Sequence, residues 1–195
     1  MRDDIQLRYG TVAMIFHWLI AALLIANLAL GLYFADLPRG DWRTELGQLH
    51  KSIGLTVLML SVLRLAWRLT HPVPPLPAGM RWGLRFAARA THWLFYVLII
   101  GIPLTGWIFV SASPVPTIFF GLFHWPNLWF MADMPRAQKI PLRETFNSIH
   151  VVLAWAAIVL IPLHVLAALY HQYIRRDELL PRMLPYRRTR VETMP

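Results

Sequence analysis

Apolar residues form four long runs along the chain, and shorter polar stretches separate them. The runs cover approximately 12–35, 50–69, 87–110 and 147–170. Each is close to the ~20 residues with which an α-helix crosses the hydrocarbon core of a bilayer. The pattern predicts an all-α fold in which residues 1–195 form one domain, an integral membrane four-helix bundle. The first run is too long for the apolar region of a removable signal peptide.

Composition and charge add the orientation. Hydrophobic residues make up 57% of the chain and charged residues 15%, with a net charge of +9. An even number of spans places both termini on one side, which carries twelve arginines against six basic residues on the other. The positive-inside rule therefore predicts cytoplasmic termini, with lipid around the bundle. No basic module interleaved with aromatics lies outside the spans, so nucleic acid is not a predicted partner.

The absence of cysteine and the location of the acidic residues exclude several kinds of metal site. The chain has no cysteine, which excludes thiolate-ligated iron–sulfur clusters and haem attached covalently through C-x-x-C-H. All ten acidic residues lie outside the four apolar runs. A di-iron carboxylate bundle and a carboxylate proton relay inside the membrane are therefore excluded as well.

Histidines inside the spans are the candidate functional residues. His150 and His164 lie fourteen residues apart in the last run, which places them ~21 Å apart along a helix and on nearly the same face. In an antiparallel bundle His50 lies at the depth of His150, and His17 at the depth of His164. Each pair could supply two axial nitrogens to one iron. The alternative is that all four are structural histidines, hydrogen-bonded across helices.

Neighbouring residues help to separate ligands from other histidines. A flat cofactor packed on a helix needs a small side chain one turn beyond its ligand. The four candidate ligands are followed at this spacing by Ala21, Gly54, Ala154 and Ala168. His92 is followed by Tyr96 instead, which argues against a ligand role. Arg64, near the inner end of the second span, either pairs with an acidic cofactor group such as a haem propionate or extends to the interface.

The long connection between the third and fourth runs, 111–145, is rich in aromatic residues and prolines. Aromatic residues are enriched where a membrane meets water. We expect this segment to lie in the outer interface as a lid over the bundle.

Several segments resemble the bacterial cytochrome b561 family of four-helix dihaem b cytochromes of the inner membrane. The segments that carry the resemblance are IFHWL, LHKSIG, RLAWRLTHPVPP, FNSIHVVLAW, PLHVLAALYHQY and LLPRMLP. The resemblance implies two haem b groups, one held by His50 and His150 outside and one by His17 and His164 inside. The family includes a superoxide:ubiquinone oxidoreductase, in which two adjacent histidines follow the last ligand; here the second of them is replaced by glutamine after His171.

The resulting interpretation is a multi-pass cytochrome of the bacterial inner membrane that transfers electrons from periplasmic superoxide to ubiquinone. We expect Lys51 and Arg143 to attract superoxide at the outer haem edge, although the outer connections are almost neutral in sum. We expect His171 to contact the quinone, unless it only caps the helix end. Two alternatives remain: a haem b subunit that links a separate redox enzyme to the quinone pool, and a non-redox transporter or binding protein with structural histidines.

Overall fold

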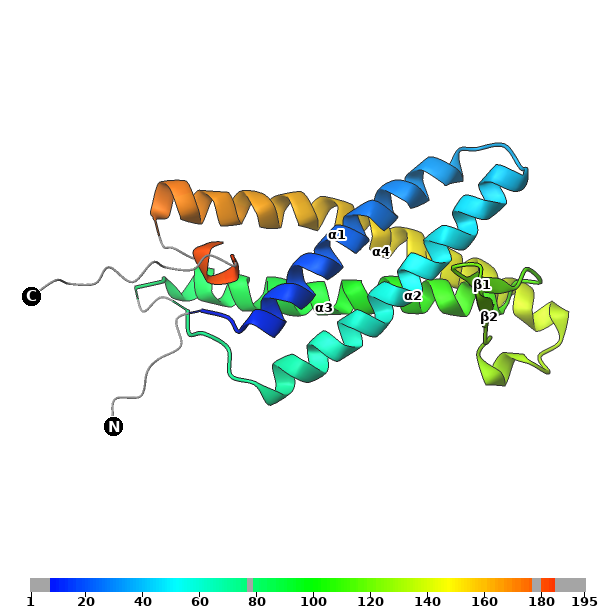
Figure 1. Cartoon of the computed structure of the whole chain (residues 1–195), viewed down its shortest axis with the longest axis horizontal. Helices are drawn as coiled ribbons and strands as arrows, with labels where there is room; N and C mark the ends of the chain where they lie inside the picture. Colours follow the sequence, from blue (N-terminus) through cyan, green and yellow to red (C-terminus); the bar gives the residue numbers. More distant parts are fainter. Residues whose placement is uncertain (1–7, 77–78, 177–179, 185–195) are drawn as a thin grey trace, which may run out of the picture.

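Four long helices dominate the computed structural model, which describes residues 8–76, 79–176 and 180–184 (Figure 1). They are α1 (Thr11–Ala35), α2 (Asp41–Thr70), α3 (Trp82–Ser111) and α4 (Arg136–Tyr170). The shorter elements are strands β1 (Thr117–Phe119) and β2 (Phe123–Trp125), 3-10 helices η1 (Trp129–Met131) and η3 (Leu180–Met183), and a π-helix η2 (His171–Arg175). The start of α1 and the end of α4 lie toward the same end of the molecule.

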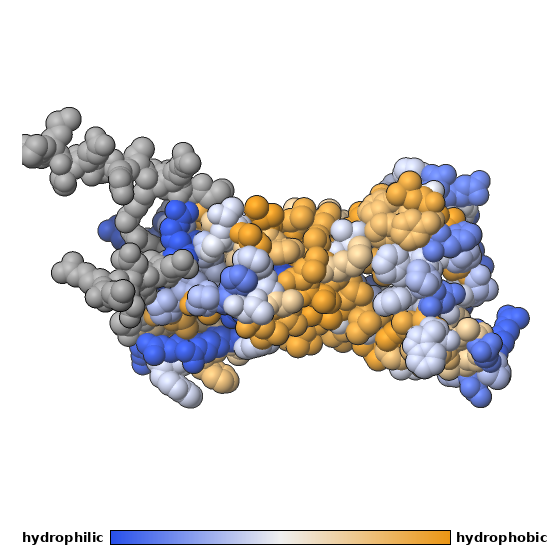
Figure 2. Space-filling model, turned by 60° about the horizontal axis from the view of Figure 1, so that its bottom comes forward, coloured by the Kyte–Doolittle hydropathy of each residue, from blue (hydrophilic) through white to orange (hydrophobic). Residues whose placement is uncertain are grey.

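All four long helices have the length and apolarity needed to cross a membrane. Large apolar side chains of α4 such as Val152, Val159 and Leu166 are exposed on the surface of the bundle. Figure 2 shows the consequence, an apolar band around the middle of the molecule with hydrophilic residues at both ends. In water such a surface would be costly, whereas lipid covers it without penalty. The prediction of four helices that are long and apolar enough to span a membrane is confirmed.

The helices extend beyond the apolar runs that predict them. Helix α2 begins at Asp41, nine residues before the run, and α4 begins at Arg136. Residues 136–145 are therefore helical, although the sequence assigned them to the outer connection. Apolar residues mark only the part of a helix that lies in lipid, and the helix itself can begin before that part. Here Pro135 precedes the first turn, a place that proline tolerates because no backbone N–H is needed there.

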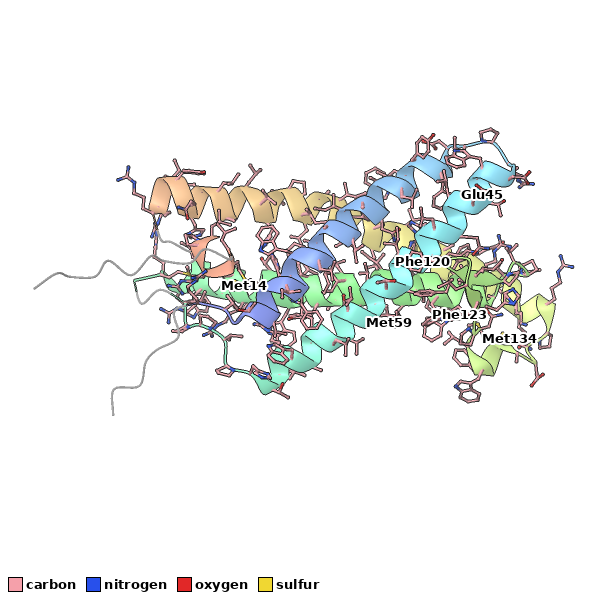
Figure 3. All side chains as sticks on the ribbon, in the orientation of Figure 1. Met14, Glu45, Met59, Phe120, Phe123 and Met134 are labelled. Carbon is pink, nitrogen blue, oxygen red and sulfur yellow. The ribbon has the colours of Figure 1, made fainter. Side chains whose placement is uncertain are left out.

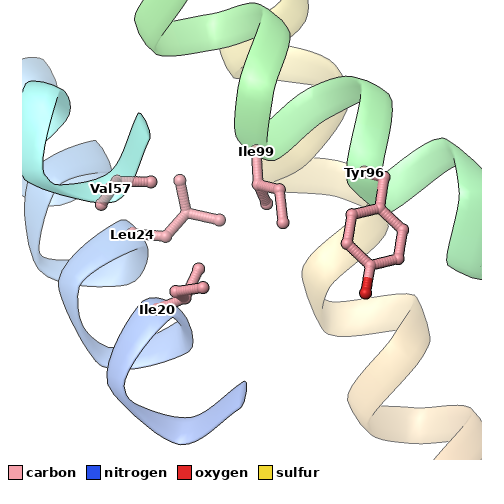
Figure 4. Close-up of a cluster of buried hydrophobic side chains, with 5 residues drawn as sticks. All are labelled: Ile20, Leu24, Val57, Tyr96 and Ile99. Atoms are coloured by element: carbon pink, nitrogen blue, oxygen red, sulfur yellow. The ribbon is translucent and has the colours of Figure 1, made fainter. Parts of the chain in front are cut away.

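The helices pack in chain order, α1 on α2, α2 on α3 and α3 on α4. A buried apolar cluster joins the first three: Ile20 and Leu24 of α1 and Val57 of α2 face Tyr96 and Ile99 of α3 (Figure 4). The pairs α1–α4 and α2–α4 are not among the closely packed pairs of described helices. These are the pairs that the candidate ligands would have to bridge.

A small antiparallel hairpin lies in the connection between α3 and α4, at the end of the bundle that is called the outer end below; the opposite end is called the inner end. Strand β1 pairs with β2 in the register Thr117 with Trp125. The turn passes through Phe120 at φ 48° and Gly121 at φ 75°, left-handed values that favour glycine at the second position. Figure 3 shows Phe120 and Phe123 toward the end of the molecule where Glu45 of α2 lies, far from Met14 of α1.

Hydrogen bonds fix this hairpin to α2 close to His50. The side chain of Gln48 accepts from the N–H of Ile118 (3.1 Å) and donates to the carbonyl of Pro116 (2.9 Å). The fully buried hydroxyl of Ser52 accepts from the N–H of Phe120 (2.9 Å). The outer connection is thus held by the turns of α2 on either side of His50.

Backbone and side-chain contacts close the inner end. The indole of Trp18, directly after His17 in α1, donates to the carbonyl of Met183 (2.7 Å). The Tyr9 N–H donates to the carbonyl of Arg182 (3.3 Å), and the Arg182 guanidinium donates to that of Pro75 (2.8 Å). Residues 180–184 therefore connect the start of α1 with the segment between α2 and α3.

Candidate functional site

His50 and His150 face each other at the outer end of the bundle. Their ring centroids are 6.1 Å apart and their planes cross at 79°. The Nδ1 of His50 lies 3.2 Å from the carbonyl of Asn27, and the Nδ1 of His150 lies 2.8 Å from the carbonyl of Ile102. A carbonyl only accepts, so each Nδ1 carries the proton and each Nε2 is left as a lone-pair donor.

Each of these two rings packs against a glycine of a neighbouring helix. Gly31 lies four residues after Asn27, and a Cβ built there would be 3.0 Å from Cε1 of His50. Gly106 lies four residues after Ile102, and its Cβ would be 3.1 Å from Cε1 of His150. In a helix, residue i+4 stands beside the carbonyl of residue i. A glycine there lets an imidazole of another helix reach that carbonyl. This arrangement occurs twice in the outer site, once for His50 and once for His150.

His17 and His164 form the facing pair at the inner end. Their ring centroids are 6.4 Å apart and their planes cross at 61°. Nη2 of Arg64, on α2, lies 3.2 Å from Nδ1 of His17. A guanidinium can only donate, so in this arrangement the proton of the neutral His17 ring is on Nε2. The inner pair therefore differs from the outer pair in what its ring nitrogens contact.

A third histidine belongs to the inner group. The ring centroid of His92, on α3, lies 6.3 Å from that of His164, as close as the ring of His17. The Nδ1 of His92 is 2.7 Å from the carbonyl of Ala88, one turn earlier in its own helix. His164 thus faces two imidazoles, and the spacing to Tyr96 in the sequence gave no indication of that proximity.

Two arginines of α2 enclose Tyr96. The Cζ atoms of Arg64 and Arg68 each lie 5.7 Å from the centroid of its ring. The charged or polar groups that interact with Arg64 in the described part of the chain are His17, His92, His164, Tyr96, Arg68 and Tyr9. None of these is a carboxylate. A partly buried guanidinium with this surrounding favours an anionic group that is not part of the described protein.

The other predicted residues are more dispersed. Lys51 follows His50 in α2 and is half-buried, whereas Arg143 is exposed and lies over Phe109 of α3, 5.6 Å from its ring. His171 begins the π-helix after α4, with its ring 5.9 Å from that of Tyr170. Gly54 faces the side chain of Asn27: its Cβ would be 3.5 Å from Nδ2. Lys51 thus adjoins a candidate ligand in the chain, and Arg64 contacts one through space.

The sequence analysis did not identify the residues that hold the outer rings. Gly31, Gly106 and Asn27 are not among the residues that the sequence predicts for the site. Asn27 offered a signal, because a polar side chain in the middle of an apolar run is costly in lipid. The carbonyls of Asn27 and Ile102 could not be found from side-chain identity, since every residue has one.

The described residues define a class: a membrane-spanning four-helix bundle with histidines facing one another at each end. The chain belongs to the prokaryotic cytochrome b561 family, whose profile matches residues 8–186. It is therefore a haem-binding electron-transport membrane protein, and the family implies haem b.

Individual relatives cover nearly the whole chain. Cytochrome b561 homolog 2 of Escherichia coli (strain K12) is 36% identical over 179 residues, which are 91% of this chain and 91% of that protein. The probable superoxide oxidase CybB of Yersinia pestis is 31% identical over 186 residues, 93% of this chain and 98% of that protein. Cytochrome b561 homolog 1 of E. coli (strain K12) is 30% identical over 189 residues, 93% of this chain and 99% of that protein.

Haem fits the outer histidines as they stand. Two imidazoles that bind one metal from opposite sides, each through a bond of about 2 Å, have ring centroids about 6 Å apart. Both facing pairs have this separation, and in the outer pair Nε2 is the unprotonated nitrogen. The described residues contain no group of three or more His, Cys, Asp or Glu that could hold a metal ion by themselves. A porphyrin, which supplies four nitrogens of its own, needs only such a pair.

The inner histidines fit haem after one change. Ligation through Nε2 of His17 requires the proton to be at Nδ1. Arg64 cannot accept that proton in a hydrogen bond, so its guanidinium would then donate elsewhere. An acidic group on the cofactor is a suitable acceptor, because no described carboxylate faces Arg64.

Proposed function

We propose that the chain is a dihaem b cytochrome that transfers electrons between the two faces of the bacterial inner membrane. His50 and His150 would ligate the outer haem, and His17 and His164 the inner haem. The observation that carries the proposal is that α4 alone contributes one histidine to each facing pair, at opposite ends of the bundle. Haem supplies the one-electron chemistry, while the helices hold its ligands and exclude water.

The proposed orientation places both termini in the cytoplasm. The basic residues of the cytoplasmic side outnumber those of the other side twelve to six. Arginine excess on one side is the main determinant of orientation in multi-pass proteins. With this orientation the hairpin and the pair His50–His150 face the periplasm.

The proposed electron donor is superoxide and the proposed acceptor is ubiquinone. A relative carries the name probable superoxide oxidase, which supports this choice. Two superoxide anions each give up one electron and leave as dioxygen. One quinone takes up the two electrons and two protons from the cytoplasmic side and leaves as quinol. The two half-reactions balance without a further reactant.

The remaining site residues receive roles in this scheme. Lys51, directly after His50, and Arg143 would raise the local concentration of the superoxide anion. Gly54 would leave space for the outer haem one turn beyond His50. Arg64 would pair with an acidic group of the inner haem. His171, at the inner end of α4, would hydrogen-bond or protonate the quinone.

Stopped-flow mixing of purified protein with superoxide tests the function. A pyridine haemochrome assay is expected to give about two b haems per chain, both with bis-histidine low-spin spectra. Superoxide is expected to reduce the haems, more slowly at higher ionic strength because salt screens the attraction by Lys51. The variant His171→Ala is expected to accept electrons normally and to pass them to added ubiquinone more slowly.

Each alternative has its own outcome in the same experiment. Haems that stay oxidised with superoxide but are reduced by a periplasmic redox partner would identify an electron-transfer subunit. Protein that folds and binds no haem would refute the cytochrome proposal and favour a transporter or binding protein with structural histidines.

A further inference from the structure

The two histidine pairs lie in opposite electrostatic surroundings. In the outer pair both Nδ1–H groups donate to backbone carbonyls, those of Asn27 and Ile102. An imidazole that donates to a carbonyl becomes a more basic ligand. A more basic ligand stabilises the oxidised form of its metal and lowers the reduction potential.

The inner pair faces a positive charge instead. Nη2 of Arg64 lies 3.2 Å from Nδ1 of His17, and Arg68, one turn further along α2, lies as close to Tyr96 as Arg64 does. No carboxylate stands among the described groups that face Arg64, so nothing described neutralises its charge. Lys51, the cation beside the outer pair, directly follows His50 in α2, and adjacent residues of a helix do not face each other. Its charge is partly exposed to water, which screens it, so it acts more weakly on the outer site.

We propose that Arg64 makes the inner pair the electron-accepting end of the molecule, by holding a positive charge that stabilises the reduced form of the inner haem. The inference rests on the proposed function, because it requires a haem at each pair. In this step one electron would leave the outer haem, which would be oxidised, and would reach the inner haem, which would be reduced. No bond is formed or broken and no proton moves in this step. Arg64 is thus not a ligand in this proposal and acts on the transferred electron only through its charge.

The size of the effect follows from Coulomb's law. At an effective dielectric constant of about 20, a unit charge in contact with a ligand ring would shift the electron distribution between the two haems by at least about tenfold. For a one-electron couple a tenfold change equals about 59 mV in midpoint potential. The acidic groups of the haem offset part of the charge, so about tenfold is the expected shift.

Spectroelectrochemical titration of the purified dihaem protein tests the inference. The variant Arg64→Gln is expected to lower the midpoint of the inner haem by about 59 mV, a tenfold change, and to leave the outer midpoint in place. The charge-conserving variant Arg64→Lys is expected to keep most of the wild-type midpoint. Arg68→Gln is the matched control, since Arg68 lies equally close to Tyr96 but is not hydrogen-bonded to His17, and it should shift the midpoint much less.

The outcomes separate this inference from the proposed function. Wild-type protein without two haems would refute the proposed function. Two haems with unchanged midpoints in Arg64→Gln, or equal shifts in Arg64→Gln and Arg68→Gln, would overturn the inference alone. If Arg64→Gln does not retain the inner haem, Arg68→Glu decides, because an acid one helical turn from Arg64 offsets its charge without removing it. A lowered inner midpoint in that variant supports the inference, and an unchanged one overturns it.

Discussion

Gly106 offers the sharpest test of how the outer site is built. In Gly106→Ala the new Cβ would lie 3.1 Å from Cε1 and 3.2 Å from Nδ1 of His150. The ring would have to move from the carbonyl of Ile102, to which its Nδ1 now donates at 2.8 Å. Such a contact in a packed helix interface costs about 1–3 kcal/mol. The displaced ring also gives up a hydrogen bond worth about 1 kcal/mol.

The chain provides a matched control in the same helix. In Gly101→Ala the new Cβ meets only Cδ1 of Leu153, at an ordinary contact distance of 3.5 Å. Both variants gain the same helix propensity, about 1 kcal/mol, so their difference isolates the contact with His150. We expect Gly106→Ala to weaken the outer site by about 2 kcal/mol relative to Gly101→Ala, roughly 30-fold in haem affinity.

Two measurements follow the effect. Haem content and the spin state of the oxidised protein report ligation by His150, and the thermal loss of the haem absorption band reports stability. Gly106→Ala should lose outer haem or convert it to high spin at lower temperature, while Gly101→Ala behaves as wild type. Equal spectra and equal thermal transitions in the two variants would refute the idea that Gly106 makes room for the ligand.

Three further predictions concern single side chains. His50→Ala should remove the outer haem and keep the inner one, and His17→Ala should do the reverse; haem stoichiometry of about one per chain checks both, and two retained haems would contradict the pairing. His92→Ala should leave both spectra low-spin because Tyr96 fills the next turn of its helix; a high-spin inner haem would instead make His92 the partner of His164. Lys51→Glu should slow reduction by superoxide in stopped flow, most strongly at low salt, and an unchanged rate would exclude Lys51 from the approach path.

The sequence predicted the helices and the depth of the histidines because both depend on a single periodicity. Runs of apolar residues define the spans. A spacing of fourteen residues places His150 and His164 on nearly the same face of one helix. The proximity of His50 to His150 and of His17 to His164 agrees with this reasoning. Their role as haem ligands stays a prediction.

Details that depend on contacts between helices could not be obtained in the same way. The closeness of His92 to His164 depends on the rotation of α3, which the apolar pattern does not determine within one turn. The contact between Arg64 and His17 joins residues forty-seven positions apart, and a long side chain can reach several partners from one backbone position. The acceptors for the outer imidazoles are backbone carbonyls, which carry no signature in the sequence.

His150 and His164 lie on one helix. The number of residues between them therefore sets the distance between the two ends of the proposed electron path. Other helices can tilt or slide without changing it. One residue inserted between these histidines would rotate the second by about 100° and shift it by about 1.5 Å, so it would face lipid or another helix. An insertion of four residues, about one turn, brings the second histidine back to within about 40° of its present face, and it lengthens the path by about 6 Å. The segment 150–164 is therefore expected to be sensitive to changes in length, in contrast to the connections at either surface.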